Sequence, residues 1–314
     1  MANTPEIHPP FSIRPPRPIF IAGPTAAGKS EIALRLAEKT GGEIISADSM
    51  QVYRGLDIGT AKPSPADRAR APHHLVDICD LREAFDAAQF VRLAQKAVEE
   101  IQSRDKIPVF CGGTGLYFKA FLEGLGEAPA TNPELRAELE ASPLKNLLAE
   151  LRERDPATFE KIDRQNPRRV VRAVEVIRLT GKKFSGLRAD WEIQNSKFKI
   201  QNYFCFTRPP EDLHRRIHVR VDEMFARGLV DETRDLLQRG LAENKFAMQA
   251  IGYRQVVEHL RGERALAATI ELVKIRTRQF AKRQLTWFRR HGNCEWIDLK
   301  TDETVEATVA RLFK

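Results

Sequence analysis

The sequence predicts an α/β protein in which a parallel sheet is flanked by helices and carries a small helical insertion domain. Three observations lead to this fold class. Apolar runs that fit buried strands alternate with amphipathic helices over residues 18–126. From 127 to 202 the chain becomes polar, basic and helical, with no strong strand pattern. An apolar run at 202–207 then resumes the strand pattern, so 18–126 and 203–314 are predicted to form one core around the insertion.

The first strand, 18–22, leads into a glycine-rich loop and a helix over 31–39. Residues 23–30 read GPTAAGKS, which fits the phosphate-binding pattern G-x-x-x-x-G-K-[ST]. Strand, loop and helix together aim free backbone N–H groups at an anion. Lys29 supplies a cation for the outer phosphate, and Ser30 offers a hydroxyl to Mg²⁺. The core is therefore predicted to be P-loop NTPase-like and to bind a diphosphate or a triphosphate, which the motif does not distinguish.

The next elements extend the β–α alternation. A strand is predicted over 42–49, a short strand over 73–78, a helix over 89–103 and a strand over 107–111. Asp48 lies where the second strand ends. Because ligands of open α/β sheets bind beyond the carboxyl ends of the strands, Asp48 is expected on the same rim as the phosphate loop.

The end of strand 107–111 is unusual for a phosphate-loop NTPase, which holds Mg²⁺ with a second strand-end acid. Here residues 112–115 read GGTG, so Asp48 is the strand-end acid near the loop. Three roles are open for Asp48. It could bind a ligand of the metal ion, act as the base for a nucleophile, or cap its own turn. Thr114 could donate to a phosphate oxygen or to a leaving group, unless 112–115 only form a tight turn.

Basic residues cluster in the insertion and in the last helix. Helices are predicted after Asn132 and after Asn166, then from a cap at Asp212 to a stop at Gly228, and over 229–241 and 265–290. The densest basic residues are Arg168, Arg169, Arg172, Lys282, Arg283, Arg289 and Arg290. A solvated helix face would explain each cluster alone, but together with Tyr253, Trp287 and Phe288 they favour RNA.

Length and composition set broad limits. The chain has 314 residues, a net charge of +8 and a pI near 9.4, which fits ordinary solubility or a polyanionic partner. Its four cysteines form no C-x-x-C pair, so a reducing, cytoplasmic setting is expected rather than zinc or disulfides. No membrane span is expected, residues 1–17 are read as a flexible tail, and a monomer is expected. The histidine pairs 73/74 and 214/218 are interpreted as structural.

Seven motifs in order resemble the tRNA dimethylallyltransferase family, also called tRNA isopentenyltransferases, over nearly the whole chain from residue 18. The motifs are residues 23–30, 46–53, 57–63, 72–77, 112–117, 248–254 and 282–288. The resemblance implies transfer of a dimethylallyl group from its diphosphate to the exocyclic N6 amine of the adenosine 3′-adjacent to the anticodon, giving N6-isopentenyladenosine with the help of Mg²⁺. The diphosphate is then the leaving group, and a flipped adenine must reach the dimethylallyl carbon at the end of a channel through the protein.

The resemblance also implies roles for residues. Asp48 would accept the amine proton, and Thr114 would steady the reacting groups. The diphosphate would be held by Gly23, Thr25, Ala26, Ala27, Gly28, Lys29 and Ser30, with Ser30 also on the metal. The anticodon stem-loop of tRNA would contact Asp48, Ser49, Met50, Gln51, Thr114, Arg136, Arg168, Arg169, Arg172, Gln249, Gly252, Tyr253, Arg254, Lys282, Arg283 and Arg289.

Three other functions remain compatible with parts of the sequence. The phosphate loop permits an ATP-dependent small-molecule kinase, although the missing acid after strand 107–111 counts against it. An isopentenyltransferase that acts on free adenine nucleotides would not need the basic insertion. A non-catalytic RNA-binding module would not need Lys29.

Overall fold

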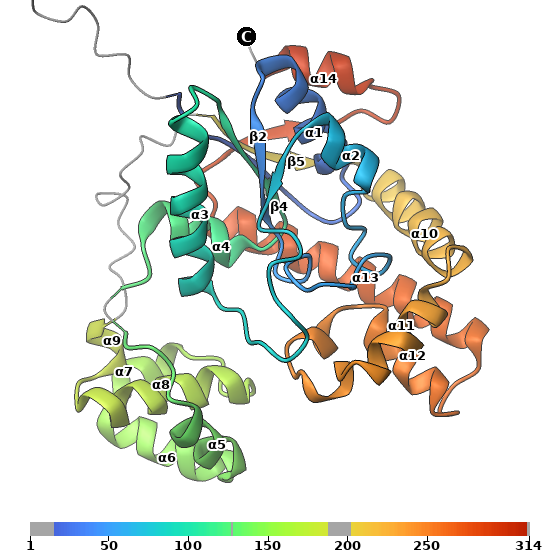
Figure 1. Cartoon of the computed structure of the whole chain (residues 1–314). Helices are drawn as coiled ribbons and strands as arrows, with labels where there is room; N and C mark the ends of the chain where they lie inside the picture. Colours follow the sequence, from blue (N-terminus) through green and yellow to red (C-terminus); the bar gives the residue numbers. More distant parts are fainter. Residues whose placement is uncertain (1–15, 127, 188–201, 313–314) are drawn as a thin grey trace, which may run out of the picture. The chain divides into compact units, whose positions relative to one another are not determined.

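The computed structural model describes residues 16–126, 128–187 and 202–312 (Figure 1). The chain divides into two compact units, Met1–Lys119 with Ile200–Lys314 and Ala120–Lys199. The second unit overlaps the residues 127–202 for which an insertion was predicted. It begins at Ala120, which lies inside helix α4 (Gly115–Glu123). Nearly all of the predicted tail, 1–17, and residues 188–201 of the predicted insertion lie outside the described residues.

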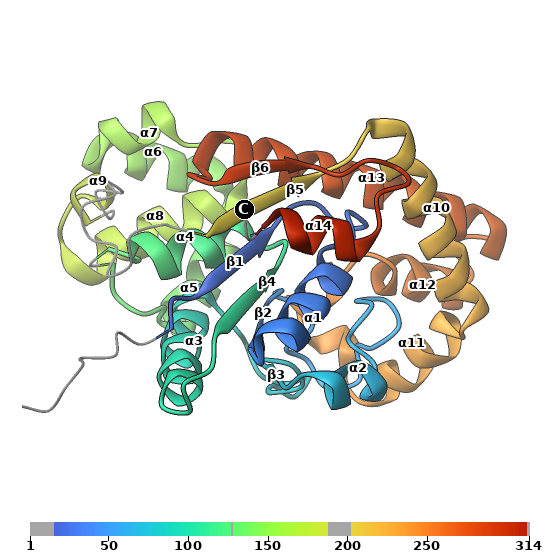
Figure 2. The same ribbon diagram turned by 90° about the horizontal axis from the view of Figure 1, so that it is seen from above.

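In the described part of the first unit, six parallel strands form one sheet in the order β3-β2-β4-β1-β5-β6 (Figure 2). The strands are β1 (Ile19–Ala22), β2 (Glu43–Ala47), β3 (His73–His74), β4 (Pro108–Gly112), β5 (Tyr203–Thr207) and β6 (Glu295–Asp298). The chain leaves β1 towards β2 but leaves β4 towards β5. Because these two neighbours send their connections in opposite directions, a crevice forms at their carboxyl ends.

Each face of the sheet has its own helical cover. Ile19 and Ile21 point to the face where α1 (Lys29–Thr40) and α14 (Val305–Arg311) pack. Phe20 points to the opposite face and stacks on Phe110 with ring centroids 4.8 Å apart. That face also carries Phe118, which packs on β5 and on Phe288 of α13 (Leu266–His291). Helix α3 (Ala87–Gln102) covers its β2–β4 side.

The strands predicted over 18–22, 42–49, 107–111 and 202–207 are confirmed as β1, β2, β4 and β5. The strand predicted over 73–78 is shorter, because Leu75 and Asp77 have φ angles of 61° and 58° that end the extended conformation after His74. Strand β6 and helix α14 were not predicted, since four and seven residues are too few for a clear periodic pattern.

The remaining helices of this unit lie mainly in the C-terminal third. They are α2 (Pro65–Arg70), α10 (Pro210–Ala226), α11 (Leu229–Gln238), α12 (Tyr253–Leu260) and the short turns Leu241–Glu243 and Ala247–Gln249. The predicted cap at Asp212 is wrong. Helix α10 begins at Pro210, whose missing N–H suits a first turn, and Asp212 pairs with Arg208 and Arg215 at 3.0 and 2.5 Å. In the described part of the chain, no helix is both long and apolar enough to cross a bilayer.

The second unit is helical, as predicted, with its own core. Its helices are α5 (Pro133–Ala141), α6 (Leu144–Arg154), α7 (Pro156–Lys161), α8 (Pro167–Thr180) and α9 (Phe184–Leu187). Asn132 and Asn166 accept N–H groups at the starts of α5 and α8, where the sequence predicted helix starts. Val170, Val174 and Ile177 of α8 face leucines of α5 and α6 in a buried cluster. This cluster gives the described helices of the second unit a hydrophobic core of their own.

Candidate active site

The phosphate loop joins β1 to α1 and is shaped by its glycines. Gly23 has a φ of 137°, and a Cβ there would lie 2.5 Å from the carbonyl oxygen of Phe206 in β5. Gly28 has a φ of 99° and occupies the N-cap position of α1. No side chain among the described residues caps this end of the helix, so its first N–H groups are available to an anion.

Lys29 lies inside the loop. Its Nζ donates to the carbonyl oxygen of Pro24 at 2.6 Å, and the side chain is buried. Burial lowers the pKa of Lys29 to about 8, because desolvation disfavours the charged ammonium. An anion bound against the loop would reverse that effect by supplying the missing countercharge.

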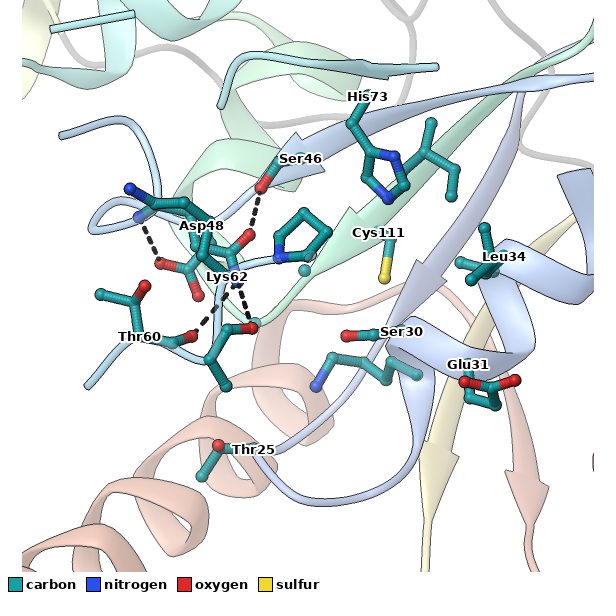
Figure 3. Close-up of a pocket in the computed structure, with 18 of the residues that line it drawn as sticks. Thr25, Ser30, Glu31, Leu34, Ser46, Asp48, Thr60, Lys62, His73 and Cys111 are labelled. Carbon is teal, nitrogen blue, oxygen red and sulfur yellow. Dashed lines mark hydrogen bonds between the residues drawn. The ribbon is translucent and has the colours of Figure 1, made fainter. Parts of the chain in front are cut away.

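A cavity of about 180 Å³ lies at the carboxyl ends of the strands and brings the phosphate loop and Asp48 together (Figure 3). Its walls include Lys29 and Ser30 on one side and Asp48 and Gln51 on another. A larger groove of about 590 Å³ runs beside it along α10. The two spaces share the lining residues Lys29, Ser30, Glu31, Ala61 and Arg220. One cavity therefore contacts both the phosphate loop and Asp48.

Asp48 closes its own turn with one carboxylate oxygen and faces the cavity. Oδ1 accepts the backbone N–H of Met50 at 2.8 Å and that of Gln51 at 3.4 Å. The capping role that the sequence left open is therefore real. Within the described residues, Oδ2 has no hydrogen-bond partner, and Asp48 lines the cavity. One oxygen thus fixes the side chain and the other can accept a proton.

Thr114 lies against the same turn. Its Oγ1 accepts the backbone N–H of Ser49 at 3.1 Å, and its own N–H donates to Ala47 at 3.2 Å. Because the hydroxyl acts as an acceptor here, its proton can be donated to another group. The cavity is lined by Gly112 and Gly113, whereas Thr114 lies just beyond its lining residues.

The glycines at 112–115 allow close packing. A Cβ at Gly112 would lie 2.1 Å from the carbonyl oxygen of Ala47 in β2. At Gly113 it would lie 2.2 Å from the side chain of Gln284, and at Gly115 it would lie 2.1 Å from the ring of Trp287. The glycine-rich turn therefore seats β4 against β2 and α13, and it places Thr114 beside the turn of Asp48.

Two residues of this site escaped the sequence reasoning. Arg220 of α10 lines both the cavity and the groove, and it makes no hydrogen bond or ion pair with any described residue. Burial lowers its pKa, while the charge of Asp48 acts in the opposite direction. Gln284 of α13 donates to the carbonyl oxygen of Gly113 at 2.9 Å and accepts the N–H of Thr25 at 2.8 Å. Gln284 lies inside motif 282–288, but its partners are 171 and 259 residues away in sequence, so the motif alone does not reveal this role. Arg220 belongs to none of the seven motifs.

The residues expected to contact RNA differ in exposure. In the first unit Gln249, Arg254, Lys282, Arg283 and Arg289 are exposed. Tyr253 and Phe288, which favoured RNA in the sequence, are both fully buried, so neither ring can stack on a base. Gly252 is buried as well, and Trp287 is partly buried beside Gly115.

Within the second unit the predicted arginines fall into two kinds. Arg168 and Arg169 are exposed. Arg136 and Arg172 instead approach the buried carboxylate of Glu175 at 3.5 and 2.8 Å, which gives both an internal structural role. The RNA contacts of all four remain predictions.

The adjacent histidines have structural partners. His73 Nδ1 lies 2.8 Å from the carbonyl oxygen of Ala71, and His74 Nε2 lies 2.7 Å from Glu43. Among the described residues, no group of three or more His, Cys, Asp or Glu side chains is arranged to hold a metal ion. A divalent ion at this site would therefore need ligands from the substrate.

The chain is similar to characterised families along most of its length. A model of a family described as IPP transferase matches residues 51–291. The tRNA dimethylallyltransferase 1 of Trichlorobacter lovleyi is 44% identical over 303 residues, covering 95% of this chain and 99% of the relative. The tRNA dimethylallyltransferase of Geobacter sulfurreducens is also 44% identical, covering 94% and 96%.

The fold is also similar to solved structures of transferases of this kind. The tRNA isopentenylpyrophosphate transferase of Bacillus halodurans matches with a TM-score of 0.68 and 37% identity, covering 95% of this chain and 94% of that one. A eukaryotic dimethylallyltransferase described as acting on tRNA matches with a TM-score of 0.75 and 30% identity, covering 90% and 74%.

Proposed function

Because this chain belongs to the tRNA dimethylallyltransferase family, we propose that it transfers a dimethylallyl group from dimethylallyl diphosphate to the N6 amine of the adenosine that follows the anticodon of tRNA, giving N6-isopentenyladenosine. The observation that carries the proposal is the single cavity lined by both the phosphate loop and Asp48. It puts an anion site and a carboxylate within reach of one substrate pair.

The diphosphate is the leaving group in this reaction. As the bond between the allyl carbon and oxygen breaks, the electron pair stays on the diphosphate. Lys29, Arg220 and the free N–H groups at the start of α1 stabilise the charge that develops there. The arginines of the larger groove, Arg215, Arg216, Arg220 and Arg227, support entry of the diphosphate along α10.

The adenine amine attacks the same carbon from the other side. When the new carbon–nitrogen bond forms, the amine must lose one proton. Oδ2 of Asp48 accepts it, while Oδ1 keeps the side chain in place through its turn. The hydroxyl of Thr114, held by the N–H of Ser49, donates to the reacting groups.

Apolar side chains protect the reactive allyl group from water. The cavity lining includes Leu34, Ile44, Pro63 and Phe280. An allyl carbon with positive character reacts readily with water, so an allyl group that lies against these apolar side chains is better placed to react with the amine.

The residues present fit Mg²⁺ as the metal. Mg²⁺ usually keeps several waters and takes only one or two protein ligands beside substrate phosphates. Ser30 is exposed at the start of α1 and lines both the cavity and the groove, so its hydroxyl can be one such ligand. When bound, the ion would neutralise charge on the diphosphate oxygens.

The compartment and the oligomeric state of the enzyme are part of the proposal. We propose that it works in the cytoplasm as a monomer, and its four free cysteines support a reducing compartment. No observation favours a kinase, because β4 ends in glycines and no acid follows it.

The proposal is tested by incubating the protein with labelled dimethylallyl diphosphate, Mg²⁺ and a tRNA transcript. Label is expected in N6-isopentenyladenosine after nuclease digestion, and a transcript with guanosine at the target position should remain unlabelled. Efficient labelling of free AMP without tRNA, or phosphate transfer from ATP, would contradict the proposal.

A further inference from the structure

The loop of residues 57–62 is a wall shared by both substrate spaces. Thr60, Ala61 and Lys62 line the cavity beside Asp48, and Ile58 and Ala61 line the groove along α10. Ala61 has a φ of 45°, which an alanine adopts only when its surroundings hold it there. The shape of this loop therefore affects both the cavity and the groove.

The inner edge of the loop is anchored to the end of β2. Gln51 Nε2 donates to the carbonyl oxygens of Thr60 and Ala61 at 3.2 and 3.4 Å. Gln51 is itself held, since its Oε1 accepts the hydroxyl of Ser46 at 3.0 Å. Lys62 has a side chain only 2% exposed and donates to Asp57 and Asp77, both at 2.6 Å.

The outer edge is held by two side chains from α11 and α12, Glu232 and Tyr253, which we call the clasp. The carboxylate of Glu232 accepts the N–H of Ile58 at 2.9 and 3.0 Å and the hydroxyl of Tyr253 at 2.6 Å. The hydroxyl oxygen of Tyr253 accepts the N–H of Gly59 at 3.0 Å. Together, two consecutive backbone N–H groups of the loop are bound by one charged network.

Contact between the loop and the clasp is close. A Cβ at Gly59 would lie 2.5 Å from the ring of Tyr253, so only glycine lets the backbone reach the ring. Tyr253 is fully buried, and burial together with the charge of Glu232 raises the pKa of its hydroxyl. The hydroxyl therefore stays protonated and can donate to Glu232. Motifs 57–63 and 248–254, separate in sequence, meet at this contact.

We propose that Glu232 and Tyr253 are positioning residues for the transfer reaction, which hold loop 57–62 in the shape that admits the diphosphate. Neither side chain lines the cavity or the groove, so they act through the loop. The inference rests on the proposed function for the identity of the diphosphate. The contact itself rests on geometry alone.

The direct test is Tyr253→Phe, which keeps the ring and removes the hydroxyl. The KM for dimethylallyl diphosphate is expected to rise about tenfold, because a wall of its site is displaced, while the KM for tRNA changes little. Amide hydrogen exchange in 57–62 should become faster in the free protein. Tyr203→Phe, which alters a buried tyrosine of β5 away from the loop, is the matched control and should change neither quantity.

A second pair of variants separates positioning from general destabilisation. Glu232→Gln retains an oxygen for the N–H of Ile58 and should preserve more diphosphate affinity than Glu232→Ala. The double variant Tyr253→Phe/Glu232→Ala should be no worse than the poorer single variant, because both changes release the same loop.

Two results would overturn the inference. One is unchanged diphosphate KM and unchanged exchange of 57–62 in Tyr253→Phe. The other is an equal loss of affinity for both substrates with a lowered Tm, which would show a merely structural role. Because exchange is read without turnover, the clasp can be judged even if the wild-type protein proves inactive on tRNA.

Discussion

At the scale of single residues, the function proposed for Lys29 requires a charged side chain, whereas its burial disfavours the charge. Its ammonium is needed as a countercharge for a diphosphate, but the loop that positions it also removes it from water. In the free protein this burial brings its pKa down to about 8. The cationic form therefore predominates only below that pH until an anion binds.

This gives a pH dependence with a defined sign. Because kcat/KM reports the free enzyme, kcat/KM for dimethylallyl diphosphate should fall as the pH rises through about 8 and Lys29 loses its proton. The corresponding fall in kcat should occur at higher pH, since bound diphosphate favours the charged form of Lys29. Steady-state rates between pH 6 and roughly 10 would show both decreases.

The control is Lys29→Met. This variant should be much less active, and its kcat/KM should not fall as the pH rises through about 8. A kcat/KM that stays level in the wild-type protein well above pH 8 would exclude Lys29 as the titrating cation.

At the scale of elements, the strand-loop-helix around the phosphate loop was predictable because its signals are local: an apolar run, a glycine pattern and a helical period. The rim position of Asp48 followed from strand order rules. The positions of Arg220 and Gln284 in the site were not predictable, because α10 and α13 present them to loops that lie far away in sequence. The burial of Tyr253 was missed for the same reason, since its partner Gly59 lies 194 residues earlier.

Gln284 shows how one helix connects two loops of the site. Gln284→Met removes partners from the N–H of Thr25 and the carbonyl oxygen of Gly113 without a large change in volume. Leaving buried polar groups unpaired is expected to cost about 1–3 kcal/mol of stability. The KM for dimethylallyl diphosphate should rise as well, because the phosphate loop loses its support.

Urea unfolding and steady-state kinetics measure the two effects. The control is Gln279→Met, an exposed position on the same helix, which should stay within about 0.5 kcal/mol of wild type. Equal stability and equal KM for Gln284→Met and the wild type would show that the bridge is dispensable.

At the scale of the whole molecule, the chain combines a core that holds the chemistry with a helical unit that has a separate hydrophobic cluster. The composition changes near residue 127, whereas the second unit begins at Ala120, inside α4. Helical spacing did not reveal which basic side chains are exposed and which form ion pairs inside the protein. Lys274 pairs with Asp222 of α10 at 2.8 Å, and Arg172 pairs with Glu175.

Exposure therefore selects Arg168 and Arg169 for a test of RNA binding by the second unit. The double variant Arg168→Glu/Arg169→Glu should raise the KM for tRNA and make binding less sensitive to salt, since fewer phosphates are neutralised. The KM for dimethylallyl diphosphate should stay at its wild-type value, and the Tm should change little, because interactions of exposed side chains contribute little to stability.

Lys182→Glu/Lys183→Glu makes the same change in charge at two other exposed positions of this unit. It should weaken tRNA binding much less. Equal effects of the two double variants would indicate a general charge effect rather than a contact at 168 and 169.

The most direct measurement for the central claim is the single-turnover rate of Asp48→Asn with saturating dimethylallyl diphosphate and tRNA. Asparagine keeps an oxygen for the N–H groups of Met50 and Gln51 but cannot accept the amine proton. We predict a rate loss of about 10²–10⁴-fold with unchanged tRNA affinity. Transfer by Asp48→Asn at the wild-type rate would contradict the assignment of Asp48 as the base.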